Sequence, residues 1–168
     1  LPDPPRPRPQ FLGYIAPEVS QDGVSMRAGF DARYAITPTL YGLVSVAPDF
    51  RNIENFIAGI DFTRTERFVA DARPFFTEGS GYFNLSPEST YGDLFYSQRV
   101  GDFDIGGKAY GQLSPSTSLG AFAAYNASGQ RAAVVNINRA ASTSSSNVFM
   151  TLDGENGRTN SAAGAKVR

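Results

Sequence analysis

Residues Val24 to Ile36 alternate strictly between two kinds of side chain. Every second position is apolar or small, namely Val24, Met26, Ala28, Phe30, Ala32, Tyr34 and Ile36. A strand places such a set on one face, whereas a helix would scatter it around its surface. The run is long for a strand of a soluble protein, which usually has about 5–6 residues. It fits the roughly 9–11 residues of a tilted membrane-spanning strand.

The opposite face of this predicted strand is polar and carries charges of both signs. It includes Arg27, Asp31 and Arg33. The lumen of a membrane barrel is polar, whereas its outer surface is apolar. In a barrel, we therefore expect these three residues to face the lumen and the apolar residues to face lipid.

The composition excludes several classes of site. The chain has 168 residues, no cysteine and no histidine, which excludes disulfides, thiolate metal sites and histidine catalysis. The formal net charge is −1, from 15 basic and 16 acidic residues, so nucleic acid is not an expected partner. No apolar run reaches the ~18 residues of a membrane-spanning helix. We expect no cofactor and no metal, because the acidic runs at Asp102–Asp104 and Asp153–Asn156 lack the spacing of a calcium loop.

Further alternating runs, separated by turn residues, predict a chain built of strands. Besides Val24–Ile36, strands are predicted at Phe11–Val19, Leu40–Ala47, Phe56–Thr63, Asp93–Val100, Asp104–Leu113, Ser118–Ala127, Arg131–Arg139, Asn147–Asp153 and Thr159–Arg168. These are about nine or ten strands and no helix, an all-β antiparallel meander that closes as a barrel or as two packed sheets. Residues 1–10 read as a proline-rich linker. Residues from about 65 to 92 read as a long internal loop.

Two aromatic segments carry a resemblance to a known family. They are Arg73-Pro74-Phe75-Phe76-Thr77-Glu78-Gly79 and Leu94-Phe95-Tyr96-Ser97-Gln98-Arg99-Val100-Gly101. The chain resembles a family of unknown function that forms a bacterial outer-membrane β-barrel behind a family 9 carbohydrate-binding module. The resemblance implies that residues 11–168 are the N-terminal part of a barrel domain and that the chain is a piece of a longer protein. It also implies a linker at residues 1–10 that follows an absent glycan-binding module.

The first aromatic segment is the main candidate for a functional site. Arg73, Phe75, Phe76 and Glu78, with Glu66 before them and Arg99 in the second segment, are predicted to bind a ligand or to line the lumen. The guanidinium of Arg73 suits a bidentate contact with a carboxylate. The structural alternative is a latch, in which both phenylalanines are packed and Arg73 pairs with Glu78. Glu66, Asp71 and Glu78 could also act as the paired carboxylates of a glycosidase, but no spacing in the sequence selects a pair.

These observations favour a non-enzymatic protein of the Gram-negative outer membrane. It would act as a pore, a transporter wall or a surface scaffold, with membrane lipid as its partner and a possible link to glycans. One alternative is a soluble β-sandwich that binds glycans or accompanies a glycoside hydrolase, and the other is a glycan-cleaving enzyme. A sandwich would bury large apolar residues between two sheets.

Overall fold

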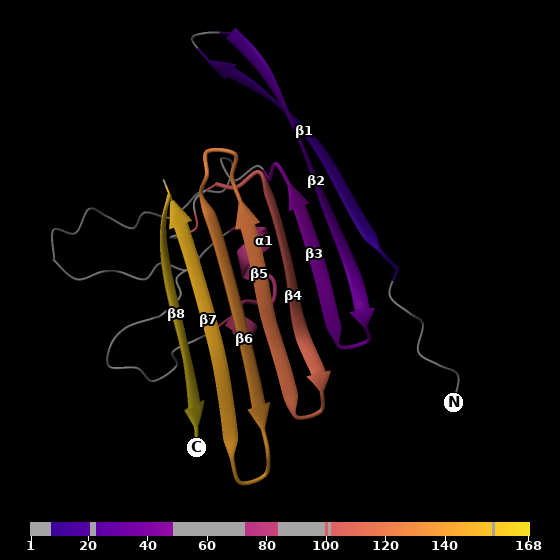
Figure 1. Cartoon of the computed structure of the whole chain (residues 1–168). Helices are drawn as coiled ribbons and strands as arrows, with labels where there is room; N and C mark the ends of the chain where they lie inside the picture. The colour runs from indigo at the N-terminus through magenta and orange to yellow at the C-terminus, as the bar shows by residue number, and fades with distance from the viewer. Residues whose placement is uncertain (1–7, 21–22, 49–72, 84–99, 101, 156) are drawn as a thin grey trace, which may run out of the picture.

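The protein forms one antiparallel sheet in which the strands follow each other in chain order (Figure 1). The computed structural model describes residues 8–20, 23–48, 73–83, 100, 102–155 and 157–168. The eight strands are β1 (Gln10–Ser20), β2 (Gly23–Thr37), β3 (Leu40–Val46), β4 (Ile105–Ser114), β5 (Thr117–Tyr125), β6 (Arg131–Ala140), β7 (Ser145–Glu155) and β8 (Arg158–Val167). Two short helices, α1 (Pro74–Thr77) and η1 (Ser80–Phe83), lie against one face of the sheet.

The strand pairing follows from alternating runs joined by tight turns. Each strand begins and ends within about two residues of its predicted bounds. Pro17 lies on β1, which is an edge strand of the described sheet, where a missing backbone donor is tolerated. The strands predicted at Phe56–Thr63 and Asp93–Val100 fall on residues outside the described part, apart from Val100.

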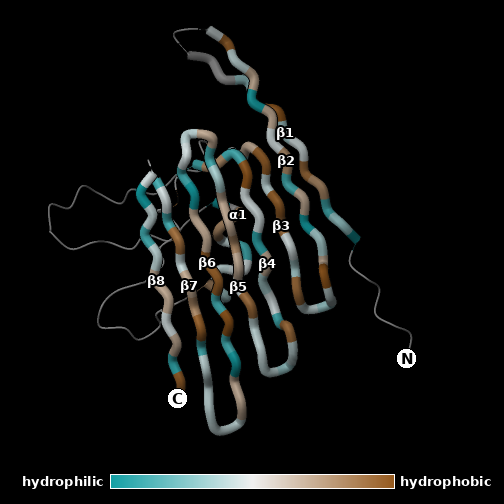
Figure 2. The backbone as a smooth tube through the Cα atoms, in the orientation of Figure 1, coloured by the Kyte–Doolittle hydropathy of each residue, from teal (hydrophilic) through white to brown (hydrophobic). Residues whose placement is uncertain are grey.

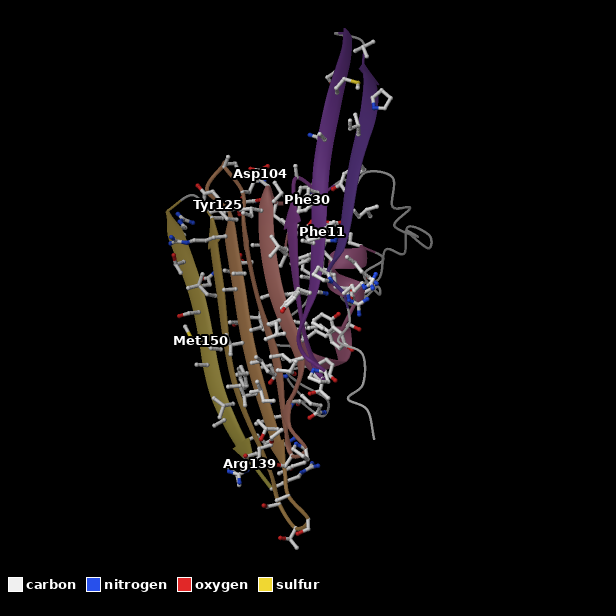
Figure 3. All side chains as sticks on the ribbon, turned by 90° about the vertical axis from the view of Figure 1, so that its right-hand side faces the viewer. Phe11, Phe30, Asp104, Tyr125, Arg139 and Met150 are labelled. Carbon is white, nitrogen blue, oxygen red and sulfur yellow. The ribbon has the colours of Figure 1, made fainter. Side chains whose placement is uncertain are left out.

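The two faces of the sheet have different compositions. We call the face that carries α1 and η1 the inner face, and the opposite face the outer face. The register aligns side chains across neighbouring strands, so that Tyr41, Tyr110 and Gly120 share the inner face. The alternation is visible along the strands in Figure 2. Figure 3 shows the two short helices on one side of the sheet and Met150 on the other.

Within the described residues, the hydrophobic core lies on the inner face alone. Side chains of β3 to β6 pack there against the two short helices and Phe103. The buried members are Leu43, Phe75, Phe76, Phe83, Phe103, Tyr110, Phe122, Ala124, Ala132 and Val134. Among the described residues, no segment covers the outer face, where Phe11, Met150 and Val148 remain 69%, 50% and 55% exposed.

The two helices correct the prediction of a chain without helices. Pro74 occupies the first helical position of α1, where its missing N–H and fixed φ are compatible with a helix. The amides of Phe76 and Thr77 donate to the carbonyl oxygen of Arg73, at 2.9 and 3.0 Å. Gly79, with a φ of 68°, ends this turn in a conformation that favours glycine. Alternation of side chains does not reveal a helix of four residues, because such a helix is too short to show a hydrophobic period. In the part of the chain that the structure describes, no helix is long and apolar enough to cross a membrane.

Candidate functional site

The candidate site is the contact between the inner face and residues 73–83, which we call the docked segment. This segment comes from the connection between β3 and β4 and lies over the inner side of the sheet (Figures 1 and 3). Its η1 helix contacts β5 and β6. It carries four of the residues that the sequence selected, Arg73, Phe75, Phe76 and Glu78.

Aromatic side chains form the apolar half of this contact. Phe75 packs edge-on against Phe76 and Phe103, with ring centres 5.0 and 4.8 Å apart. Phe122 of β5 lies 5.7 Å from both Phe76 and Phe83. Edge-to-face pairs of this kind add to the stabilisation that comes from burying the rings. The docked segment is therefore attached to the sheet by a packed cluster of phenylalanines.

Lys108 forms the polar half of the contact. It is a buried residue on the inner face of β4, and its Nζ donates to the carbonyl oxygens of Phe75 and Glu78. These carbonyls lie in α1 and just after it, where a helix end leaves acceptors without intrahelical donors. The ammonium also lies 5.0 Å from the ring centre of Tyr110. One lysine thus satisfies two backbone acceptors and ties the end of α1 to the sheet.

Glu78 connects the docked segment to β2 and β4. The hydroxyl of Tyr110 donates to Glu78 Oε1, and Arg33 Nε lies 2.9 Å from the same oxygen. The Arg33 guanidinium also lies 5.1 Å above the ring of Tyr41. Tyr41 and Tyr110 stack with their ring centres 5.9 Å apart. This places a charged pair and two tyrosines together on the inner face.

A second polar contact holds η1. Asn136 of β6 is only 1% exposed, and its Nδ2 donates to the carbonyl oxygen of Tyr82 over 2.8 Å. Asn147 of β7 in turn donates to Asn136 Oδ1 over 2.6 Å. A buried amide needs such partners on both its oxygen and its nitrogen. The two amides therefore link the docked segment to β6 and β7 of the sheet.

Two glycines allow the close approach of the docked segment. A Cβ at Gly79 would lie 2.3 Å from the ring of Tyr110, and a Cβ at Gly120 would lie 2.3 Å from the carbonyl oxygen of Tyr82. Real side-chain carbons do not tolerate either distance. Glycine is therefore required on both sides of the contact, once in the segment and once in β5.

Arg73 is buried at the start of the docked segment. Its Nη1 donates to the carbonyl oxygen of Val100 over 2.7 Å, and its guanidinium lies 4.2 Å above the ring of Phe76. These contacts fix the start of the docked segment on the sheet.

A small pocket lies at the end of β5 and β6, beside this contact, and three core residues, Phe103, Ala124 and Ala132, help to line it. It has a volume of about 60 Å³ and is lined in part by Asp102, Asn126, Arg131 and Glu155. This volume exceeds the roughly 10–15 Å³ that a cavity needs to hold one water molecule. Among the described residues, no group of three Asp or Glu side chains is arranged to hold a metal ion. The described contacts of residues 73–83 with the sheet form a docking site for this segment.

The family assignment comes from residues 8–124, which match a family model described as a domain of unknown function (DUF5916). The chain belongs to this family. No curated protein and no solved structure matches the chain. The DUF5916 region includes β1 to β5 and the docked segment, so Lys108, Tyr110 and Gly120 all lie within it. Asn136 and β6 to β8 follow it along the chain.

The structure brings together part of the predicted site. Phe75 and Phe76 are packed against the sheet, as the latch alternative predicted. The predicted pairing of Arg73 with Glu78 is wrong in the described contacts, because Glu78 pairs with Arg33 of β2 instead. Arg73 donates to the carbonyl oxygen of Val100. Glu66, Asp71 and Arg99 lie outside the described residues.

The three predicted lumen residues share the inner face of β2. Asp31 accepts a hydrogen bond from Ser45 of β3, and Arg33 pairs with Glu78. Arg27 lies on the part of β2 beyond β3, opposite Ala16 of β1. Sequence reasoning missed Lys108 and Asn136. Their signal was a long polar residue at an inner position between small or apolar neighbours, which favours a buried partner over a solvated surface.

Proposed function

We propose that the chain forms part of the wall of a bacterial outer-membrane β-barrel, with the docked segment inside the lumen. The role is non-enzymatic. The wall encloses a passage or serves as a surface scaffold, and the docked segment narrows the lumen. The outer face would contact lipid, and the inner face would contact water and the docked segment.

The observation that carries the proposal is the composition of the outer face. Nearly every described outer position from β1 to β8 is apolar, glycine or alanine, and Arg131 and Arg139 are the only charged ones. The large members are exposed, and they include Phe11, Ile15, Met26, Phe30, Tyr34, Val44, Ile105, Tyr125, Val135, Ile137, Val148 and Met150. Monomeric soluble proteins rarely expose an apolar patch larger than a few hundred Å². A lipid environment accounts for such a surface without any covering layer.

The spacing of the two outer-face arginines fits the thickness of a membrane. They lie near opposite ends of β6, with the apolar residues Ala133, Val135 and Ile137 between them. Eight residue steps at about 3.4 Å span roughly 27 Å along the strand. With a strand tilt of 35–45°, this corresponds to about 20 Å across the membrane, close to the ~25 Å apolar band of outer-membrane barrels.

The inner face supports the same proposal because the docked segment and several polar side chains already occupy it. Lys108, Asn136 and the Arg33–Glu78 pair lie there beside the docked segment. In a soluble sandwich, by contrast, a second sheet would cover the apolar face. The described residues contain one sheet only, and their core lies on its other side. A glycan-binding partner domain upstream would follow from the resemblance noted in the sequence.

Cell fractionation tests the proposal. The full-length protein is expected in the outer-membrane fraction, where it should require detergent for extraction and migrate faster on gels before heating than after. Both properties follow from a closed, lipid-embedded sheet. Recovery from the soluble periplasm without detergent, and with no heat-dependent shift, would exclude a membrane barrel.

A further inference from the structure

We infer that the outer face carries a binding site for the phosphate of one anionic lipid, built on Arg131 where β6, β7 and β8 lie side by side. The inference rests on the proposed lipid-facing wall. It adds the chemical class of one ligand and the residues that hold it. Phosphate is the expected group because a guanidinium binds two of its oxygens at once through parallel hydrogen bonds.

The side chain of Arg131 lies across the neighbouring strand. The register places Arg131 of β6, Gly154 of β7 and Thr159 of β8 in one row on the outer face. Arg131 Nη2 donates to Thr159 Oγ1 over 2.7 Å, so the arginine side chain crosses β7 to reach β8. The guanidinium is therefore held against the sheet surface.

Gly154 allows this conformation of the arginine. A Cβ at position 154 would lie 2.6 Å from Arg131 Nε and 2.9 Å from its Cγ. A residue with a side chain would therefore have to displace the arginine from β7. Gly154 and Thr159 together position the guanidinium before a ligand arrives, which lowers the entropy that binding costs.

The charge of Arg131 is not neutralised on its own face. Among the described residues, no outer strand position carries Asp or Glu. Asp153 and Glu155 flank Gly154 along β7, and they fall at inner positions because side chains alternate along a strand. The described contact of the guanidinium is with a hydroxyl and leaves most of its five N–H donors for an anion.

Thr159 supplies a further donor at the same place. Its Oγ1 accepts from Arg131, and a hydroxyl that accepts one hydrogen bond still has its own hydrogen to donate. In the described contacts, this hydroxyl donates to no protein group. A phosphate oxygen beside the guanidinium would receive hydrogen bonds from both side chains.

The position of this row along the strands suits a headgroup. Tyr125 of β5 lies directly opposite Arg131 and is 50% exposed. Aromatic residues flank the apolar band of outer-membrane barrels at the membrane interfaces. Ala133, Val135 and Ile137 follow Arg131 on the same face of β6. A lipid with its phosphate at Arg131 would therefore place its chains along this apolar stretch.

Arg139 is a matched control within the same strand. It lies on the same face of β6, at the opposite end of the sheet from Tyr125 (Figure 3). Its cross-strand neighbours are Thr117 and Ser146, and no contact among the described residues fixes its guanidinium. A general attraction to anionic headgroups acts on both arginines, whereas a built site acts at Arg131 alone.

Lipid binding to the full-length protein in uncharged detergent micelles tests the site. The unfolding temperature is followed while short-chain phosphatidylglycerol is added, and a parallel arm receives sodium phosphate instead. We expect the lipid to raise the unfolding temperature of the parent protein, because a ligand of the folded state stabilises it. Arg131→Gln should weaken the apparent affinity by at least about tenfold, through the loss of charge-assisted hydrogen bonds. Arg139→Gln should bind the lipid as the parent does.

Two further variants keep the charge of Arg131 and remove what positions it. They are Gly154→Ala and Thr159→Val. We expect each to weaken lipid binding several-fold, because the guanidinium loses its fixed place. A non-specific attraction between the charge and the headgroup would leave the affinity unchanged in both.

The results separate this inference from the proposed barrel. Equal affinities in Arg131→Gln and Arg139→Gln, or no loss in either charge-retaining variant, would overturn the site and leave the barrel wall intact. An equal rise in unfolding temperature with sodium phosphate would overturn the lipid as the ligand. A full-length protein recovered from the soluble periplasm would overturn the wall and the site together.

Discussion

Gly120 of β5 lies directly beneath the backbone of Tyr82 in the docked segment. A Cβ at Gly120 would come within 2.3 Å of the Tyr82 carbonyl oxygen and 2.8 Å of its carbonyl carbon. Backbone atoms cannot swing aside as the end of a flexible side chain can. The contact between Gly120 and Tyr82 therefore sets how closely the docked segment approaches the sheet.

Replacing this glycine should lift the segment from the sheet. Gly120→Ala is expected to destabilise the folded protein by about 1–3 kcal/mol, the usual cost of overpacking. Gly107→Ala on neighbouring β4 is the control, because the nearest atom to its new Cβ would be 3.9 Å away. Urea unfolding in detergent micelles compares the two. Equal urea midpoints for Gly120→Ala and Gly107→Ala would show that the docked segment does not require a glycine at position 120.

Lys108→Met should release the end of α1. The substitution keeps most of the apolar stem but leaves the carbonyl oxygens of Phe75 and Glu78 without their donor. Each unsatisfied buried group costs about 1–3 kcal/mol. Hydrogen exchange of residues 73–83 should accelerate, whereas Lys166→Met at the exposed end of β8 should leave it unchanged. Unchanged protection in Lys108→Met would contradict the role of this lysine.

The Arg33–Glu78 pair should contribute little stability of its own. Both side chains are partly exposed, at 40% and 30%. A double-mutant cycle with Arg33→Met and Glu78→Gln is expected to give a coupling of about 0.2–1 kcal/mol that falls as salt is added. A coupling that is large and insensitive to salt would mean that the pair is shielded from water.

Asn136→Leu should lower the free energy of unfolding more than the loss of an exposed amide does. The variant leaves the Tyr82 carbonyl oxygen without its donor and also removes the acceptor for Asn147. We expect a loss of about 1–3 kcal/mol in unfolding free energy. Asn160→Leu, at an exposed inner position of β8, is the matched control. A smaller effect at Asn136 than at Asn160 would argue against the amide contact.

The strands could be predicted from the sequence because their signal is local. Alternation over Val24–Ile36 fixes both the strand and its faces, and turn residues such as Pro38 and Pro115 mark the hairpins. A short turn also fixes which residues of the two strands of a hairpin pair with each other. This is why Arg27, Asp31 and Arg33 were correctly predicted to share one face of the strand, whereas a lumen on that side stays a prediction.

The docked segment could not be predicted in the same way. α1 and η1 are each four residues long, which is too short for a hydrophobic period. Their partners, Lys108 and Asn136, are far away in the sequence, and only the folded sheet brings them to the segment. Sequence proximity suggested Glu78 as the partner of Arg73, but the sheet supplied Arg33 for Glu78 instead.

Two adjacent alanines of β8 offer the most direct test of whether the outer face contacts lipid, as proposed. Ala162 is an exposed inner position opposite Thr151, and Ala163 is an exposed outer position opposite Met150. The measurement is the unfolding free energy of the full-length protein in a bilayer for Ala162→Arg and Ala163→Arg. We predict that Ala163→Arg loses about 2–4 kcal/mol, the cost of arginine on a barrel's lipid face, while Ala162→Arg on the lumen side is tolerated. If both variants instead stay within about 0.5 kcal/mol of the parent, as exposed substitutions do in soluble proteins, the outer face does not contact lipid.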